Sequence, residues 1–101
     1  MATPLLAASV DYSREVKPIL AENCYKCHGA AQRKGGLRLD TAALAVKGGE
    51  RGAAIKPGKS AESPLIQAIK GTHPELPRMP HKRPPLTDTQ IASIEQWVEQ
   101  G

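Results

Sequence analysis

The residues with the clearest chemistry stand together in one short segment, Cys24-Tyr25-Lys26-Cys27-His28. Two thiols two residues apart, followed at once by a histidine, form the pattern of a c-type haem attachment site. The spacing has a chemical reason, because a tight turn brings both sulfurs to one edge of a porphyrin, where they can form two thioethers. The histidine then follows under the macrocycle, where its imidazole can ligate the iron. The segment therefore predicts a covalently bound haem, with Cys24 and Cys27 as the anchors and His28 as an iron ligand.

Two other uses of this segment remain open from the residues alone. A Cys-x-x-Cys pair can form a redox disulfide, but such a pair usually opens a helix in a βαβ unit, and no strand-rich pattern accompanies it here. The pair could also supply half of a zinc site, which normally needs four nitrogen or sulfur ligands. Beyond the segment itself, the chain offers only His73 and His81 for that purpose.

The composition gives weak support for a cofactor. The chain has 101 residues, no Phe, nine Pro and nine Gly, and its only aromatic residues are Tyr12, Tyr25 and Trp97. A single small domain of this kind has few large side chains with which to fill a core. A large apolar macrocycle held in the middle of the domain would compensate for that shortage.

The first ten residues have the character of a linker. They include Leu5-Leu6-Ala7-Ala8 but no basic residue, and they are too short for a whole signal peptide. We interpret residues 1–10 as a linker, a signal remnant or a cloning tail, and residues 11–101 as the domain. No stretch is long and apolar enough to span a membrane. Because covalent haem is attached outside the bacterial cytoplasm, we expect a periplasmic or otherwise extracytoplasmic location and a separate export signal.

The positive charge of the chain is concentrated in its middle. The net charge is +4, but residues 26–83 carry +8, whereas residues 1–25 carry −1 and residues 84–101 carry −3. A basic excess around the predicted haem favours an acidic redox protein or a fused redox domain as the partner. A solvated basic surface without a specific partner is the alternative. Nucleic acid is disfavoured, since no aromatic residues interleave the basic ones.

A helix is predicted from Asp11 or Ser13 towards Asn23. Pro18 lacks the amide donor that an interior position needs, so it should lie near the first turn or kink the helix. The helix then delivers the cysteines at its C-terminal end. Its apolar face is formed by Val16, Ile19 and Leu20.

The last helix has the clearest local signals. Thr87 and Gln90 form a capping box, and Leu86 and Ile91 form a hydrophobic staple across it. We expect the apolar face to cross the first helix near Val16, Ile19 and Leu20, with Trp97 in the core. That face consists of Ile91, Ile94 and Val98.

Two short helices are predicted between the outer ones. One runs over residues 42–46, capped by Asp40 or Thr41 and stopped by Gly48. The other begins with Ser63 as the N-cap before Pro64 and ends at Gly71. Its apolar face is formed by Leu65, Ile66 and Ile69. No strand pattern competes, so the predicted fold is all-α with long loops.

The segment Leu37-Arg38-Leu39 alternates apolar and basic residues. Both leucines are free to face the haem, and Arg38 could reach a haem propionate. A solvent-exposed role for Arg38 is an equal alternative.

Met79 is the candidate for the second iron ligand. Apart from Met1 it is the only methionine, and it stands in a proline-rich loop, residues 72–85, rather than on a helix face. A soft thioether suits haem iron and raises its reduction potential. His73 and His81 of the same loop are the rival ligands.

At this point the chain resembles the planctomycete-type cytochrome c domain, over roughly residues 11–101. The ordered motifs that carry the resemblance are Val16-x-Pro18-Ile19-Leu20, Cys24-x-x-Cys27-His28-Gly29, Gly36-Leu37-Arg38-Leu39-Asp40, Lys47-Gly48-Gly49, Pro57-Gly58, Ser63-x-Leu65-Ile66, Arg78-Met79-Pro80, Leu86-Thr87 and Trp97-Val98-x-x-Gly101. The resemblance implies the class I cytochrome c fold, with three to five short helices around one haem. It also implies His28 as the proximal ligand and Met79 as the distal one. The family often has a second proline after Met-Pro, where this chain has His81. Such domains are often fused to larger extracytoplasmic proteins, so the chain could be an excised piece of one.

The expected function is one-electron transfer through a His/Met-ligated haem. No general base or nucleophile cluster accompanies the motif, so we do not expect an enzyme. A haem-based sensor or weak peroxidase, in which Met79 leaves the iron, is one alternative. A zinc-binding structural module that uses Cys24, Cys27, His28 and one further histidine is the other.

Overall fold

The computed structural model describes residues 9–101, and these form four α-helices joined by long loops. A π-helical turn and two 3₁₀ turns accompany the helices, and the described residues contain no β-strand beyond two isolated bridges. The all-α prediction is therefore confirmed. The elements are η1 (Tyr12–Val16), α2 (Lys17–Asn23), η2 (Lys34–Gly36), α3 (Ala42–Lys47), η3 (Ser60–Glu62), α4 (Pro64–Lys70) and α5 (Asp88–Gln100).

The first helix is continuous but changes its winding before Pro18. Of the two predicted starts, Asp11 is the cap, and it accepts hydrogen bonds from the amides of Ser13 at 3.0 Å and Arg14 at 3.4 Å. Residues 12–16 then form a wider π-helical turn, and Pro18 occupies the first turn of α2. Pro18 has no amide hydrogen to donate, so a regular α-helix would lack one backbone hydrogen bond at this position. The change from π-helical to α-helical winding falls at the same place.

The predicted capping box of α5 is present. The Thr87 hydroxyl accepts from the Gln90 amide at 3.1 Å, and the Gln90 side chain accepts from the Thr87 amide at 2.9 Å. On the predicted apolar face, Ile94 and Val98 are buried at 0% and 2% exposed, whereas Ile91 is only partly buried.

The helix α4 departs from its prediction at one residue. Ser63 stands at the N-cap position, but its hydroxyl makes no cap hydrogen bond. It accepts instead from the Lys56 amide at 2.9 Å and donates to the Lys59 carbonyl at 2.9 Å. Ser63 is fully buried, and it satisfies backbone groups of the preceding loop that water cannot reach.

The helices pack around one small core. The helix α5 packs against α4 and against η1, where the rings of Tyr12 and Trp97 lie 4.8 Å apart between centroids. The predicted crossing of the outer helices is therefore confirmed at the Tyr12–Val16 end, whereas Ile19 is only partly buried. The largest fully buried side chains are Val16, Leu20, Leu39, Ile66, Ile69, Ile94 and Val98.

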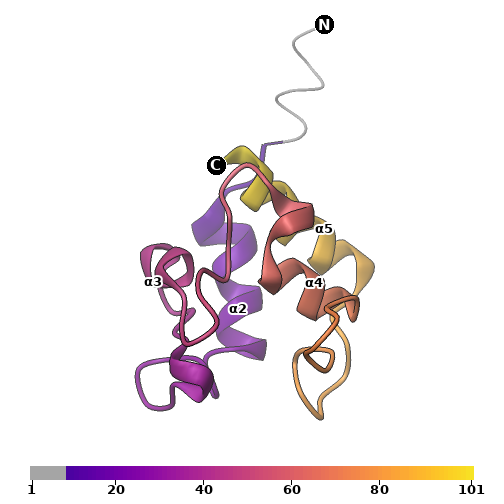
Figure 1. The fold of residues 1–101 in the computed structure, drawn as a ribbon. Helices are drawn as coiled ribbons and strands as arrows, with labels where there is room; N and C mark the ends of the chain where they lie inside the picture. Colours follow the sequence, from indigo (N-terminus) through magenta and orange to yellow (C-terminus); the bar gives the residue numbers. More distant parts are fainter. Residues whose placement is uncertain (1–8) are drawn as a thin grey trace, which may run out of the picture.

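The two ends of the described chain are joined. The Gln100 side chain donates to the Val10 carbonyl at 3.0 Å and accepts from the Val10 amide. Figure 1 shows that the chain ends lie at one end of the molecule, while the loop after α2 and the loop between α4 and α5 lie at the other. Residues 1–8 of the predicted linker lie outside the described residues.

A glycine turn after α3 fixes the loop that follows the cysteine segment. Thr41 caps α3 and Gly48 ends it, as predicted. The next residues dock on η2, where the Glu50 amide donates to the Gly35 carbonyl at 2.8 Å. A Cβ at Gly49 would lie 2.4 Å from the Gly35 oxygen and 2.8 Å from the Leu37 nitrogen. Only glycine allows this approach of two backbones.

We therefore expect Gly49→Ala to lower the free energy of unfolding by about 2–3 kcal/mol, because the backbones must separate. Gly35→Ala is the matched control. A Cβ there meets nothing within 4 Å, although the φ of +66° is unfavourable for alanine, which costs about 1 kcal/mol. Denaturant unfolding of both variants measures the difference, and equal losses would contradict close docking at Gly49.

Candidate functional site

The Cys24–His28 segment forms a compact turn at the C-terminal end of α2. The Leu20 carbonyl accepts from the Cys24 amide at 2.8 Å and from the Tyr25 amide at 3.1 Å. The Cys24 carbonyl in turn accepts from the amides of Cys27 at 3.2 Å and His28 at 2.9 Å. Both cysteines and the histidine are thus carried by one rigid continuation of the helix, as a c-type haem motif needs.

The other side of the turn is held by the segment that follows it. The His28 carbonyl accepts from the Leu39 amide at 2.7 Å, and the Cys27 carbonyl accepts from the Lys34 amide at 2.9 Å. Gly29 is required where the chain reverses, since a Cβ there would lie 2.5 Å from the Tyr25 oxygen. These bonds bring Leu37-Arg38-Leu39 beside the cysteine turn.

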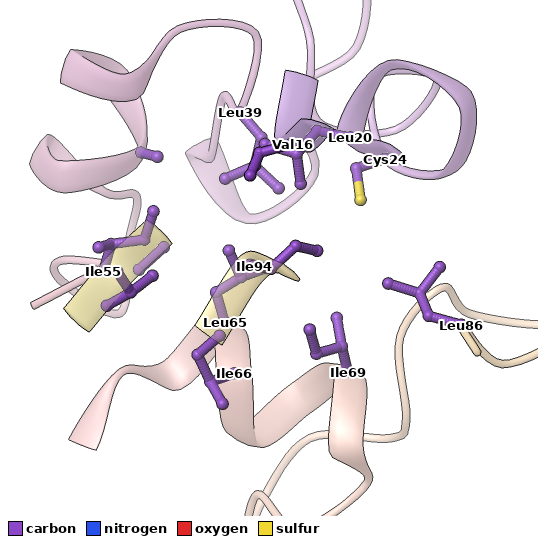
Figure 2. Close-up of a cluster of buried hydrophobic side chains, with 13 residues drawn as sticks. Val16, Leu20, Cys24, Leu39, Ile55, Leu65, Ile66, Ile69, Leu86 and Ile94 are labelled. Atoms are coloured by element: carbon purple, nitrogen blue, oxygen red, sulfur yellow. The ribbon is translucent and has the colours of Figure 1, made fainter. Parts of the chain in front are cut away.

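The two thiols have different surroundings. Cys24 is 8% exposed and belongs to the apolar core, whereas Cys27 is half-buried. Figure 2 shows the Cys24 sulfur pointing away from its helix, towards the side of the core where Ile69 and Leu86 lie. Burial raises the pKa of Cys24 to about 11, against a smaller opposing effect of the positive charge of Arg83. A buried neutral thiol suits attachment to an apolar group better than it suits a zinc ion, which takes thiolates.

His28 has the protonation state of an iron ligand. Burial lowers its pKa, although the nearby backbone carbonyls of Leu37 and Lys34 act in the opposite direction. The imidazole is therefore neutral at pH 7, the form that binds metals. Its Nδ1 atom is buried and forms no aligned hydrogen bond with either carbonyl. With Nδ1 buried, Nε2 is the nitrogen through which the ring would bind a haem iron.

The proline-rich loop places Met79 against the core. The chain leaves α4 through Gly71 in a left-handed conformation, with its amide bonded to the Ala68 carbonyl at 3.1 Å and the Thr72 amide bonded to the Gln67 carbonyl at 2.8 Å. The loop then returns, and the Met79 amide donates to the same Ala68 carbonyl at 3.0 Å. Met79 is partly buried and packs on the core cluster, and its peptide bond to Pro80 is cis.

The two rival histidines lie elsewhere in this loop. His81 is exposed in a turn next to Lys82. His73 is half-buried, and its Nδ1 accepts two backbone hydrogen bonds within the loop. Within residues 9–101, no three His, Cys, Asp or Glu side chains come together as a metal site. The described chain thus offers no zinc site built on the cysteine turn and a further histidine.

The leucine segment follows its predicted alternation. Leu39 is 2% exposed in the core, and Leu37 packs against the core from its edge. Arg38 points to Asp40 instead, and its Nε donates to Oδ1 at 3.0 Å while Nη2 donates to Oδ2 at 2.5 Å. The guanidinium lowers the pKa of Asp40. Contacts of these three residues with a haem remain predictions.

Sequence reasoning missed two features of this site. The Ala68 carbonyl, which positions Met79, has no signal in the sequence because any residue supplies a carbonyl. The acceptor role of His73 was also missed, since only the turn geometry reveals it. A surface hollow of about 450 Å³ lies between α4, α5 and the loop that joins them, and neither Cys24, His28 nor Met79 lines it.

The model of the planctomycete cytochrome c family matches residues 24–82, more than half of the chain. The match begins at the first cysteine and includes the cysteine turn, the leucine segment, the glycine turn and Met79. No curated protein and no solved structure matched the chain.

Proposed function

Because the chain belongs to the planctomycete cytochrome c family, we propose that it carries one covalently attached haem c and transfers single electrons. The observation that carries the proposal is the Cys24–His28 turn, whose backbone hydrogen bonds fix both cysteines and the histidine at one helix end. When bound, a haem supplies a ferric/ferrous couple that changes by one electron. We propose a carrier and not an enzyme.

Each residue of the proposed site has a separate role. Cys24 and Cys27 would hold the porphyrin through thioethers, and His28 and Met79 would ligate the iron. A neutral thioether favours ferrous iron and so raises the potential. Met79 is held by its backbone bond to Ala68, so its position does not depend on the weak sulfur–iron bond alone. Leu37 and Leu39 would exclude water from the same region.

We propose an extracytoplasmic location, in keeping with covalent haem attachment. Among residues 9–101, the structure has no helix with the length and hydrophobicity that a bilayer crossing requires.

The proposal predicts that the protein, produced with the haem-attachment machinery, keeps its haem through denaturation and acid–acetone extraction. Its mass should exceed the sequence mass by one haem. Cys24→Ala and Cys27→Ala should each leave a single thioether, visible as a shift of the pyridine haemochrome band. The double variant should release its haem on extraction, and wild-type protein that releases its haem would disprove covalent attachment.

The role of Met79 is tested by substitution. In the ferric protein we expect the weak near-infrared band that is typical of a sulfur–iron bond in this family. Met79→Ala should lose the band and bind carbon monoxide in the ferrous state, whereas Met79→His should stay low-spin without the band. The potential should fall in both variants, since a thioether stabilises ferrous iron.

A wild-type protein without the band, whose spectrum changes only in His81→Ala, would instead have two histidine ligands. Rapid carbon monoxide binding by the wild type would favour the sensor or peroxidase alternative.

We propose that the partner is acidic and docks on a basic rim at the loop end of the molecule. The rim is defined by six exposed cations of the two loops, none of which pairs with a carboxylate within the described chain: Lys26, Arg33, Lys34, Arg78, Lys82 and Arg83. Both loops lie at the same end of the molecule (Figure 1), so their charges act together on an approaching partner.

Electron exchange with an acidic redox protein should therefore slow as ionic strength rises, because salt screens exposed charges. The double variant Lys82→Gln/Arg83→Gln should slow the exchange at low salt and flatten its salt dependence. Lys56→Gln/Lys59→Gln removes the same charge near the C-terminal end of α5, where the Gly58 amide bonds to the Val98 carbonyl, and should have a smaller effect. Equal effects of the two pairs would contradict docking at the basic rim.

A further inference from the structure

We propose that His73 is a positioning residue for the Met79 loop, because its imidazole holds the turn through which the loop returns to α4. Loss of this acceptor would then loosen the loop and, with it, Met79. The part that concerns the Met79–iron bond rests on the proposed function, whereas the part that concerns the loop itself does not.

The loop is closed at its base by one carbonyl. The Ala68 oxygen accepts from Gly71, where the chain leaves α4, and from Met79, where the chain returns. Seven residues lie between these two points, and they must reverse direction within that length. The guanidinium of Arg78 lies on Gly71 and leaves no room for a side chain there, since a Cβ would be 2.7 Å from its Nε.

The reversal is made around the His73 side chain. Its Nδ1 accepts from the amide of Glu75 at 3.0 Å and from the amide of Leu76 at 3.1 Å. The intervening Pro74 has no amide hydrogen. One ring nitrogen thus satisfies both amides that the turn presents, in the way that an Asn or Asp oxygen does in an Asx turn.

This arrangement fixes the role of each ring nitrogen. An Nδ1 that accepts two hydrogen bonds carries no proton, so the ring hydrogen is on Nε2. A side chain without an acceptor at this position would leave both amides of the turn without this partner.

The test compares the near-infrared sulfur–iron band of the ferric haem-loaded protein between variants at one fixed pH. His73→Asn keeps a side-chain acceptor that can form an Asx turn, so it should keep the band. His73→Ala removes the acceptor and should weaken the band. The control is His81→Asn, which removes the exposed histidine of the same loop and should behave like wild type.

A second readout separates this inference from the ligand assignment. Protection factors of the Glu75 and Leu76 amides, measured by hydrogen exchange, should fall in His73→Ala and be restored in His73→Asn. If the wild type lacks the band but these factors depend on His73, the ligand assignment fails and the positioning role stands. If His73→Ala keeps the band and the protection of the wild type, the positioning role is overturned.

Discussion

The free carbonyl groups at two helix ends hold the two loops that carry the candidate ligands. A helix leaves its last carbonyls without partners inside the helix, and these must be satisfied by other groups. At the end of α2, the Leu20 carbonyl takes the amides of Cys24 and Tyr25, and at the end of α4, the Ala68 carbonyl takes those of Gly71 and Met79. Because the described part of the fold has no sheet, these backbone hydrogen bonds are what fixes the geometry of the two loops.

The small core explains why these backbone bonds matter. Its buried side chains are aliphatic and of moderate size, and a cysteine is one of them. The aromatic pair, Tyr12 and Trp97, is used at the contact between η1 and α5. The third aromatic residue, Tyr25, lies in the cysteine turn and is only partly buried against the core. A covalently held macrocycle would add apolar area that these side chains do not supply.

The sequence predicted what depends on local rules, and it missed what depends on contacts between distant backbones. The capping box at Thr87 and the buried face of α5 follow from residue types a few positions apart. Ser63 shows the limit: its type and place are those of an N-cap, but burial directs its hydroxyl to a loop. The close approach of Gly49 to Gly35 and the return of Met79 to Ala68 depend on tertiary packing, which no local pattern specifies.

The clasp between Val10 and Gln100 makes the described chain nearly a closed ring. In such a chain, the position of the termini has little effect on which helices pack together. A circular permutant, joined across Val10 and Gln100 and opened in an exposed turn, should therefore form the same helices and loops. The cysteine turn and the methionine loop both lie at the end of the molecule opposite this clasp (Figure 1).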